Sequence, residues 1–157
     1  MALEHELGLR KPIELLPHEA LLNIYYTASC LKKRADEFLR GFGLTDVQFN
    51  VMMLLWYQSG PEGGLSQAQL SDMMLVNRAN VTSLIDRMEK AALVARTASP
   101  GDRRYNIVKM TSRGKKLFAK VEPLYARQVQ EIMAVFKAGE QKRLVAMLGR
   151  IRGELAR

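Results

Sequence analysis

The sequence has very few of the residues that build disulfides, metal sites and membrane spans. Its 157 residues include one cysteine and two histidines. One cysteine excludes an internal disulfide, and no cluster of Cys and His supplies the three or four ligands of a typical zinc site. No apolar run approaches the ~18 residues of a membrane-spanning helix, and the N-terminus lacks the charged-then-apolar order of a signal peptide. We therefore expect a cytoplasmic protein that holds no metal ion and no cofactor.

Sequence motifs for catalysis are also missing. His5 and His18 both lie near the N-terminus, without a nucleophile or a carboxylate at motif spacing. The sequence contains no phosphate-binding loop and no dinucleotide fingerprint. These observations predict a binding protein and not an enzyme.

The charge of the chain is basic and unevenly distributed. The formal net charge is +8, and residues 66–116 alone contain ten basic and four acidic side chains. A basic excess favours a polyanionic partner. A membrane-surface protein would concentrate this charge on one long amphipathic helix, whereas here it is spread over several predicted elements. Nucleic acid is therefore the expected partner.

Residues 66–92 have the pattern of a helix-turn-helix. Ser66 and Gln69 form a capping box that opens a short helix ending near Leu75, and Asn77 can cap a second helix after a turn. Apolar residues on the second helix recur at helical spacing and predict one buried stripe, formed by Val81, Leu84, Ile85, Met88 and Ala92. The opposite face carries Arg, Asn, Thr and Ser, which hydrogen-bond base edges and phosphates. The alternative for such a face is simple solvation.

A basic hairpin is predicted directly after this helix. Residues 93–98 and 105–110 have the composition of strands. Residues 99–104 between them contain the Pro, Gly and Asp that a turn needs, and end in two arginines that the turn does not need. Paired arginines suit a narrow groove lined with phosphates. The hairpin therefore strengthens the interpretation of the preceding helix as a DNA-reading element.

The N-terminal third predicts a loose arm and two helices. Pro12 and Pro17 are expected to interrupt the arm at residues 1–16. A long helix is expected from His18 to Gly41 or Gly43. Thr45 and Gln48 form a second capping box, which opens a helix that stops before the loop at residues 59–64.

The C-terminal third predicts two further helices. Thr111 is expected to cap a helix that continues past Phe136 with a kink at Pro123, and Gly139 is expected to separate it from the last helix. These two helices and the long N-terminal helix together have more apolar surface than a small monomer can bury.

Three stretches carry a resemblance to the MarR family of winged helix-turn-helix transcription regulators. They are the run NRANVTSLIDRMEK at residues 77–90 with Leu93 and Val94, the wing signature Asp102-Arg103-Arg104 with Ile107, Val108, Met110, Thr111 and Gly114, and Gly43-Leu44-Thr45 with Gln48 and Phe49. The likeness covers nearly the whole chain from about Leu21, and the wing signature is its most specific part.

The resemblance implies a mainly α (α+β) fold over residues 1–157 as a single domain. Residues 1–41 would form an arm and the first dimerisation helix, 44–111 a winged helix-turn-helix lobe with a two-stranded wing, and 112–157 the C-terminal dimerisation helices. In the family the arm often crosses to the partner subunit, which would make Ile13, Leu15 and Leu16 interface residues; a frayed tail is the alternative. The implied partners are a second copy of the chain and a palindromic operator in double-stranded DNA.

The resemblance also implies the residues that bind DNA. Asn77 would cap the recognition helix near the DNA backbone, Arg104 would enter the minor groove, Asp102 would orient Arg104, and Arg103 would contact a phosphate. The full expected set is Asn77, Arg78, Asn80, Thr82, Ser83, Arg87, Asp102, Arg103 and Arg104.

A small aromatic or lipophilic effector that releases a repressor from DNA is the further implication. Its expected pocket is formed by Tyr25, Tyr26, Met52, Met53 and Trp56. By default, Met52, Met53 and Trp56 at helical spacing are core residues, so this alternative stays open. Cys30 also has two interpretations, a packed apolar residue or an oxidation sensor near Arg34, although the sensing cysteine of some relatives aligns near Leu21.

Two other functions remain compatible with the sequence. A winged helix can use its basic face for protein contacts, or it can bind DNA without sequence preference and without an effector.

Overall fold

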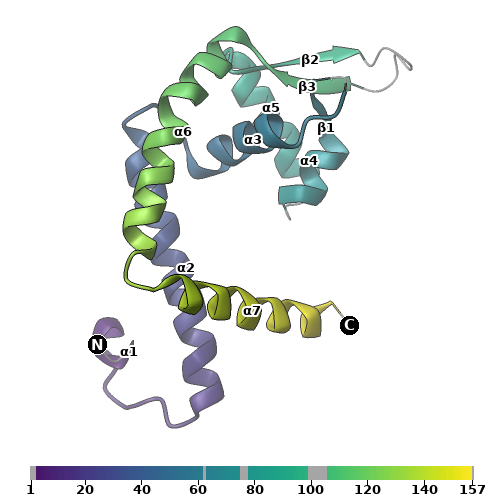
Figure 1. The fold of residues 1–157 in the computed structure, drawn as a ribbon. Coiled ribbons are helices and arrows are strands. Elements are labelled where there is room, and N and C mark those ends of the chain that lie inside the picture. The colour runs from purple at the N-terminus through teal and green to yellow at the C-terminus, as the bar shows by residue number, and fades with distance from the viewer. Residues whose placement is uncertain (1–2, 62, 75–77, 99–105, 157) are drawn as a thin grey trace. The chain divides into compact units, whose positions relative to one another are not determined.

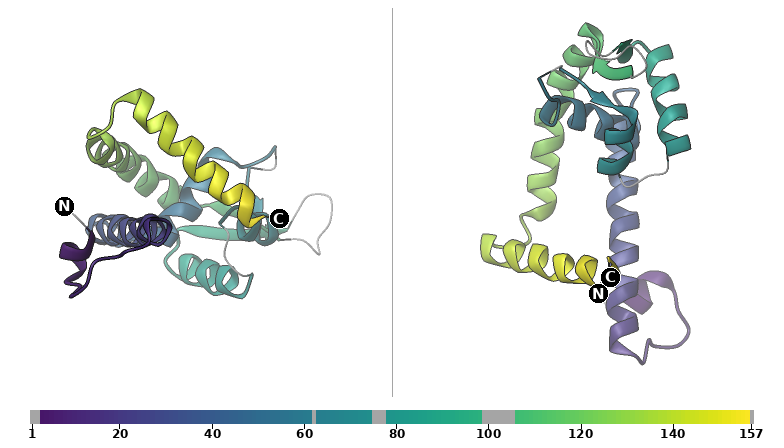
Figure 2. Two further views of the ribbon diagram at one scale, coloured as in Figure 1. Left: turned by 90° about the horizontal axis from the view of Figure 1, so that it is seen from below. Right: turned by 90° about the vertical axis from the view of Figure 1, so that its right-hand side faces the viewer.

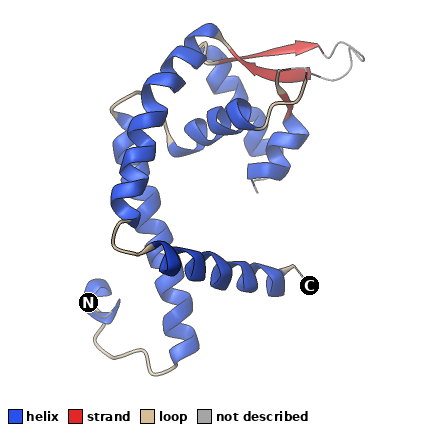
Figure 3. Ribbon diagram, viewed as in Figure 1, coloured by secondary structure: helices blue, strands red, loops and turns tan. Residues whose placement is uncertain are grey.

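The computed structural model of the chain is mainly helical, with one small antiparallel sheet (Figures 1 and 3). It describes residues 3–61, 63–74, 78–98 and 106–156. The chain divides into two compact units, Met1–Thr111 and Ser112–Arg157. Within the described residues, no helix is both long enough and apolar enough to cross a membrane.

The N-terminal arm has more structure than the sequence predicted. It contains a short helix, α1 (Leu3–Leu7), whose Leu3 is buried. The carboxylate of Glu4 accepts the backbone N–H of Ile13 at 3.3 Å, which ties the two ends of the arm together. Pro17 does not interrupt the arm but lies in the first turn of the next helix, where its missing N–H leaves no hydrogen bond unmade.

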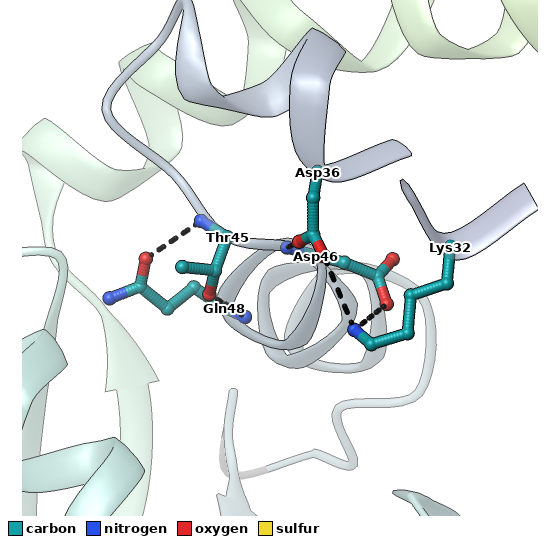
Figure 4. Close-up of polar contacts among 5 residues, drawn as sticks. All are labelled: Lys32, Asp36, Thr45, Asp46 and Gln48. Atoms are coloured by element: carbon teal, nitrogen blue, oxygen red, sulfur yellow. Dashed lines mark hydrogen bonds and ion pairs between the residues drawn. The ribbon is translucent and has the colours of Figure 1, made fainter. Parts of the chain in front are cut away.

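The long helix α2 (Leu16–Arg40) and helix α3 (Asp46–Tyr57) follow as predicted. The turn between them passes through Gly43, whose φ of +71° is the left-handed conformation that glycine adopts at low cost. The predicted capping box is confirmed: the Thr45 hydroxyl accepts the Gln48 N–H at 3.3 Å, and the Gln48 side chain accepts the Thr45 N–H at 3.0 Å (Figure 4).

The sheet has three strands, one more than the sequence predicted. The two expected strands, β2 (Val94–Ala98) and β3 (Asn106–Met110), pair in antiparallel register with Val94 opposite Met110. The third is β1 (Leu65–Ser66), which pairs with the other side of β3, so that the strand order is β1-β3-β2. Because β1 is only two residues long, it gives no alternating pattern in the sequence.

The core of the first unit lies between the sheet and helices α3, α4 (Gln67–Met74) and α5 (Arg78–Lys90). All three helices contact the sheet (Figure 2). The predicted capping box of α4 is confirmed, with the Ser66 hydroxyl accepting the Gln69 N–H and the Gln69 side chain accepting the Ser66 N–H. The fully buried side chains include Met52, Leu70, Val81, Ile85, Met88, Val94 and Val108.

The second unit consists of α6 (Ser112–Met133) and α7 (Ala138–Leu155). The sequence placed the end of α6 too late, because Phe136 lies in the turn after it, and Gly139 lies inside α7 rather than before it. The side-chain amide of Gln141 donates to the carbonyl oxygens of Met133 and Phe136, both at 3.1 Å. These two bonds satisfy carbonyls at the end of α6 and fix the turn.

Gly64, directly before β1, lies so close to β3 that a side chain there would clash with β3. A Cβ there would lie 2.5 Å from both the Val108 carbonyl oxygen and the Ile107 Cγ2 on β3. We expect Gly64→Ala to lower the free energy of unfolding by ~1–3 kcal/mol, because β1 must move away from β3. The melting temperature should fall by roughly 2–10 °C. Gly60→Ala is the matched control, since nothing lies within 4 Å of its Cβ; equal melting temperatures for the two variants would contradict the close approach.

Candidate nucleic-acid interface

The second helix of the helix-turn-helix, α5, separates its apolar and polar residues cleanly. Val81, Leu84, Ile85 and Met88 are buried, as the sequence predicted. Ala92 does not belong to this stripe, because it is exposed and lies beyond the end of the helix. Burial of the stripe fixes the rotation of α5 about its axis and thus determines which residues face outward.

The expected DNA-binding residues that can be described all lie on the exposed side of α5. Asn80, Thr82, Ser83 and Arg87 are exposed. Arg78 is the first residue of the helix, but its side chain is outside the described part of the structure, as are Asn77, Asp102, Arg103 and Arg104. The structure thus shows the exposure of four of the nine residues, and their contacts with DNA stay a prediction.

Two of these side chains make further polar contacts. The Gln67 side-chain amide at the start of α4 donates to the Thr82 hydroxyl at 3.3 Å, which links the two helices of the motif. The Nε of Arg87 donates to the Ser83 carbonyl oxygen at 3.3 Å, so the Arg87 side chain follows the helix surface. The sequence did not predict a role for Gln67. Its position directly after the capping residue Ser66, at the first residue of α4, is the signal that could have indicated one.

A tight turn joins α5 to β2. The N–H of Leu93 donates to the Met88 carbonyl at 2.9 Å and the N–H of Ala92 to the Glu89 carbonyl at 2.8 Å, which is the Schellman pattern. Ala92 has the left-handed φ of +56° that this turn requires. The hydroxyl of Thr111, expected to cap α6, donates to the Ala92 carbonyl at 2.6 Å. The end of β3 is thereby attached to the end of α5.

A groove of about 460 Å³ lies beside the polar face of α5. Its lining residues are Lys32, Asp36, Thr45, Val47, Gln48, Asn80, Ser83, Leu84 and Arg87. Side chains from α2 and from the start of α3 therefore meet three of the expected DNA-binding residues on one surface.

Polar contacts fix the α2–α3 side of this groove (Figure 4). The Lys32 ammonium lies 3.5 Å from the carboxylates of both Asp36 and Asp46. Asp36 also accepts the backbone N–H of Asp46 at 3.0 Å. That N–H holds the pKa of the Asp36 carboxyl below its ordinary value, and the Lys32 ammonium acts in the same direction. Lys32 is thus part of a cluster of ion pairs that joins α2 to the start of α3.

The residues expected to form the effector pocket differ in their exposure. Met52 is fully buried and belongs to the core of the first unit, whereas Tyr26 and Met53 are half-buried. Tyr25 is exposed on α2, and Trp56 is 47% exposed on α3. The groove described above is lined by a different set of residues, so the effector pocket stays a prediction.

Cys30 is exposed on α2, so its interpretation as a packed apolar residue is wrong within the single chain. Its side chain lies close enough to Tyr26 to raise the pKa of that hydroxyl above its ordinary value.

A helix-turn-helix followed by an antiparallel sheet that carries a basic hairpin defines a winged-helix DNA-binding protein. The chain belongs to the MarR family, whose family model matches residues 44–105. It is similar to the transcriptional regulator MhqR of Bacillus subtilis, with 29% identity over 116 residues that make up 74% of this chain and 77% of MhqR. It is a DNA-binding transcriptional regulator, as its relatives among the transcriptional regulators indicate.

Solved structures share the fold. A crystal structure of the Staphylococcus aureus MepR–DNA complex has a TM-score of 0.76 at 21% identity, covering 85% of this chain and 96% of that one. The organohalide-sensing regulator RdhR-CbdbA1625, in its 2,4-dichlorophenol-bound form, has a TM-score of 0.79 at 19% identity, covering 93% and 87%. These likenesses confirm the predicted winged-helix architecture.

The left-handed conformation of Ala92 leads to a prediction about thermal stability. A non-glycine residue in this conformation costs about 1 kcal/mol, and glycine adopts it freely. We expect Ala92→Gly to raise the melting temperature by roughly 1–4 °C. Ala91→Gly serves as the control, because Ala91 has no positive φ and glycine there should give no gain. A lower melting temperature for Ala92→Gly than for the unchanged protein would contradict the assigned turn.

Proposed function

We propose that the protein is a homodimeric repressor that binds an inverted-repeat operator and is released by a small aromatic or lipophilic effector. The observation that carries the proposal is the polar row on α5. Asn80, Ser83 and Arg87 are spaced by three and four residues, so they lie along one face of the helix. All three are exposed, while the buried stripe holds the opposite face in the core.

This row suits the major groove. Asn reads adenine and Arg reads guanine through paired hydrogen bonds, and Ser contacts bases or phosphates. In the proposal, Thr82 and Arg78 contribute to the same surface, and Asn77 lies near the backbone at the start of the helix.

The hairpin supplies the second contact. The strands β2 and β3 carry the chain to and from residues 99–105, where Asp102, Arg103 and Arg104 are located. In the proposal, Arg104 enters the minor groove, Asp102 orients it by a charge-assisted hydrogen bond, and Arg103 contacts a phosphate.

Exposed apolar side chains support a dimer. Leu15, Leu16 and Leu21 are exposed in the arm and on α2. On α7, Val145, Met147, Ile151 and Leu155 are exposed too. Apolar surface of this extent marks interaction sites, and a two-fold dimer would place two recognition helices about one DNA turn, roughly 34–36 Å, apart. Residues 1–41 and 112–157 would then serve dimerisation, and residues 44–111 would bind DNA.

The effector is supported by two observations. Tyr26 on α2 and Met53 and Trp56 on α3 are partly exposed aromatic and thioether side chains, which suit a flat apolar guest. In addition, a structural neighbour exists in a 2,4-dichlorophenol-bound form. A ligand that shifts α2 against α3 would change the spacing of the recognition helices and so release the operator.

The DNA-reading roles can be separated by measurement. Genomic fragments retained by the purified protein are sequenced to define the operator, and binding constants are then measured on the operator and on single-base variants at several salt concentrations. Asn80→Ala and Arg87→Ala should lower operator affinity by about 10- to 100-fold and change base preference, because each base contact discriminates by ~1–3 kcal/mol. Arg104→Ala should weaken binding to many sequences alike and reduce the salt dependence by about one counterion.

Lys33→Ala is the control for these variants, because Lys33 is an exposed basic residue on α2 outside the proposed interface. Binding that shows no sequence preference in the unchanged protein would instead identify an architectural DNA-binding protein. Affinity that is unchanged by Arg104→Ala at every salt concentration would refute the wing assignment.

The effector pocket can be tested with the only tryptophan in the chain, Trp56. We expect 2,4-dichlorophenol to quench Trp56 fluorescence and to lower operator affinity over the same concentration range. Met53→Ala should weaken the quenching about 3- to 10-fold, since it removes a contact worth roughly 1 kcal/mol. Met73→Ala on the exposed side of α4 is the control. Quenching without any effect on DNA binding would argue against an effector role.

A further inference from the structure

Arg96 on β2 holds two carboxylates of the recognition helix at once. Its Nη2 lies 2.7 Å from the Oδ1 of Asp86, and its Nη1 donates to the Oε2 of Glu89. Its backbone N–H donates to the other oxygen of Glu89, Oε1, at 2.7 Å. Arg96 on β2 therefore makes two charge-assisted hydrogen bonds to Glu89 and one ion pair with Asp86 on α5.

The geometry of this contact differs from that of a common surface ion pair. Asp86 and Glu89 are three residues apart and project from the same side of the helix. The Arg96 side chain is only 19% exposed, whereas exposed pairs such as Arg127–Glu131 have both partners in solvent. Partial burial and the planar guanidinium, which meets two carboxylates, favour a single conformation of the Arg96 side chain. Exposed ion pairs contribute little to the stability of a protein.

The position of Arg96 gives the contact a mechanical effect. The Schellman turn at Ala92 already fixes where β2 leaves α5. Arg96 adds a second attachment farther along β2, and β2 pairs with β3 throughout its length. Val94 at the start of β2 is buried in the core, so the ion pairs of Arg96 add a polar restraint on the direction in which β2 continues beyond Val94. The hairpin is thereby held at a set angle to the recognition helix.

The contact also changes the charge that DNA meets. Asp86 is 51% exposed on a helix whose neighbouring face carries Ser83 and Arg87. An unpaired carboxylate there would repel phosphates, and the Arg96 guanidinium offsets it.

We propose that Arg96 is a positioning residue for DNA binding, which holds the hairpin at the angle at which it and the recognition helix engage the same duplex. This inference rests on the proposed function, in which both elements contact DNA. Arg96 itself touches no DNA in this account; it acts through Asp86, Glu89 and the direction of β2.

The experiment uses the full-length protein on its selected operator duplex. Two footprints are compared: protection of guanine N7 from methylation, which reports the major groove, and hydroxyl-radical protection of the flanking minor groove, which reports the hairpin. Arg96→Met should abolish the flanking protection and lower operator affinity at least tenfold, while guanine protection persists at saturating protein. Arg127→Met, which removes an exposed ion pair on α6, is the control and should leave both footprints unchanged.

A triple variant separates position from charge. Asp86→Asn, Glu89→Gln and Arg96→Met together leave no unpaired carboxylate but still lack the guanidinium fork. We expect the flanking protection to stay absent in the triple variant, even where affinity at low salt recovers. Full recovery of the flanking protection would show that Arg96 only neutralises charge and would overturn the proposal.

The other possible outcomes distinguish a failure of the positioning role from a failure of the proposed function. If Arg96→Met fails to fold, as judged by circular dichroism, the triple variant gives the result, because positions 86 and 89 then carry no carboxylate that lacks a partner. Unchanged flanking protection in a folded Arg96→Met variant would refute the positioning role alone. Absence of any sequence-selective footprint in the unchanged protein would instead refute the proposed function.

Discussion

The burial of one apolar stripe on α5 is the constraint on which the rest of the structure depends. Val81, Leu84, Ile85 and Met88 pack into the core, and this leaves Asn80, Ser83 and Arg87 no direction except outward. A helix rotated by a single residue, about 100°, would carry the polar row out of the exposed face. The polar contact between Gln67 and Thr82 and the turn at Ala92 then secure the two ends of a helix whose orientation is already determined.

Local signals in the sequence predicted local structure well. Both capping boxes, at Thr45 and Ser66, involve residues three positions apart and were readable directly. The buried stripe followed from helical periodicity. The strand β1 was missed because two residues give no period, and the end of α6 was misplaced because the side chain that stops it, Gln141, comes from the next helix.

The candidate site was predictable only as a set of residue types. Sequence spacing placed Asn80, Ser83 and Arg87 on one face, but it could not show that Lys32 and Gln48, more than thirty residues earlier in the chain, line a groove beside them. It also counted Arg96 among many basic residues. The contacts of Arg96 with Asp86 and Glu89 depend on how β2 leaves the helix, and that direction is a tertiary property.

The exposed thiol of Cys30 has a practical consequence for studying this molecule. It is the sole cysteine of the chain, so a maleimide spin label attaches at one defined position on α2. In the proposed two-fold dimer, two such labels would yield a single interspin distance by pulsed electron resonance. That distance would change whenever the long helices of the two subunits move apart or together, which makes Cys30 a ready gauge of quaternary rearrangement without further mutation.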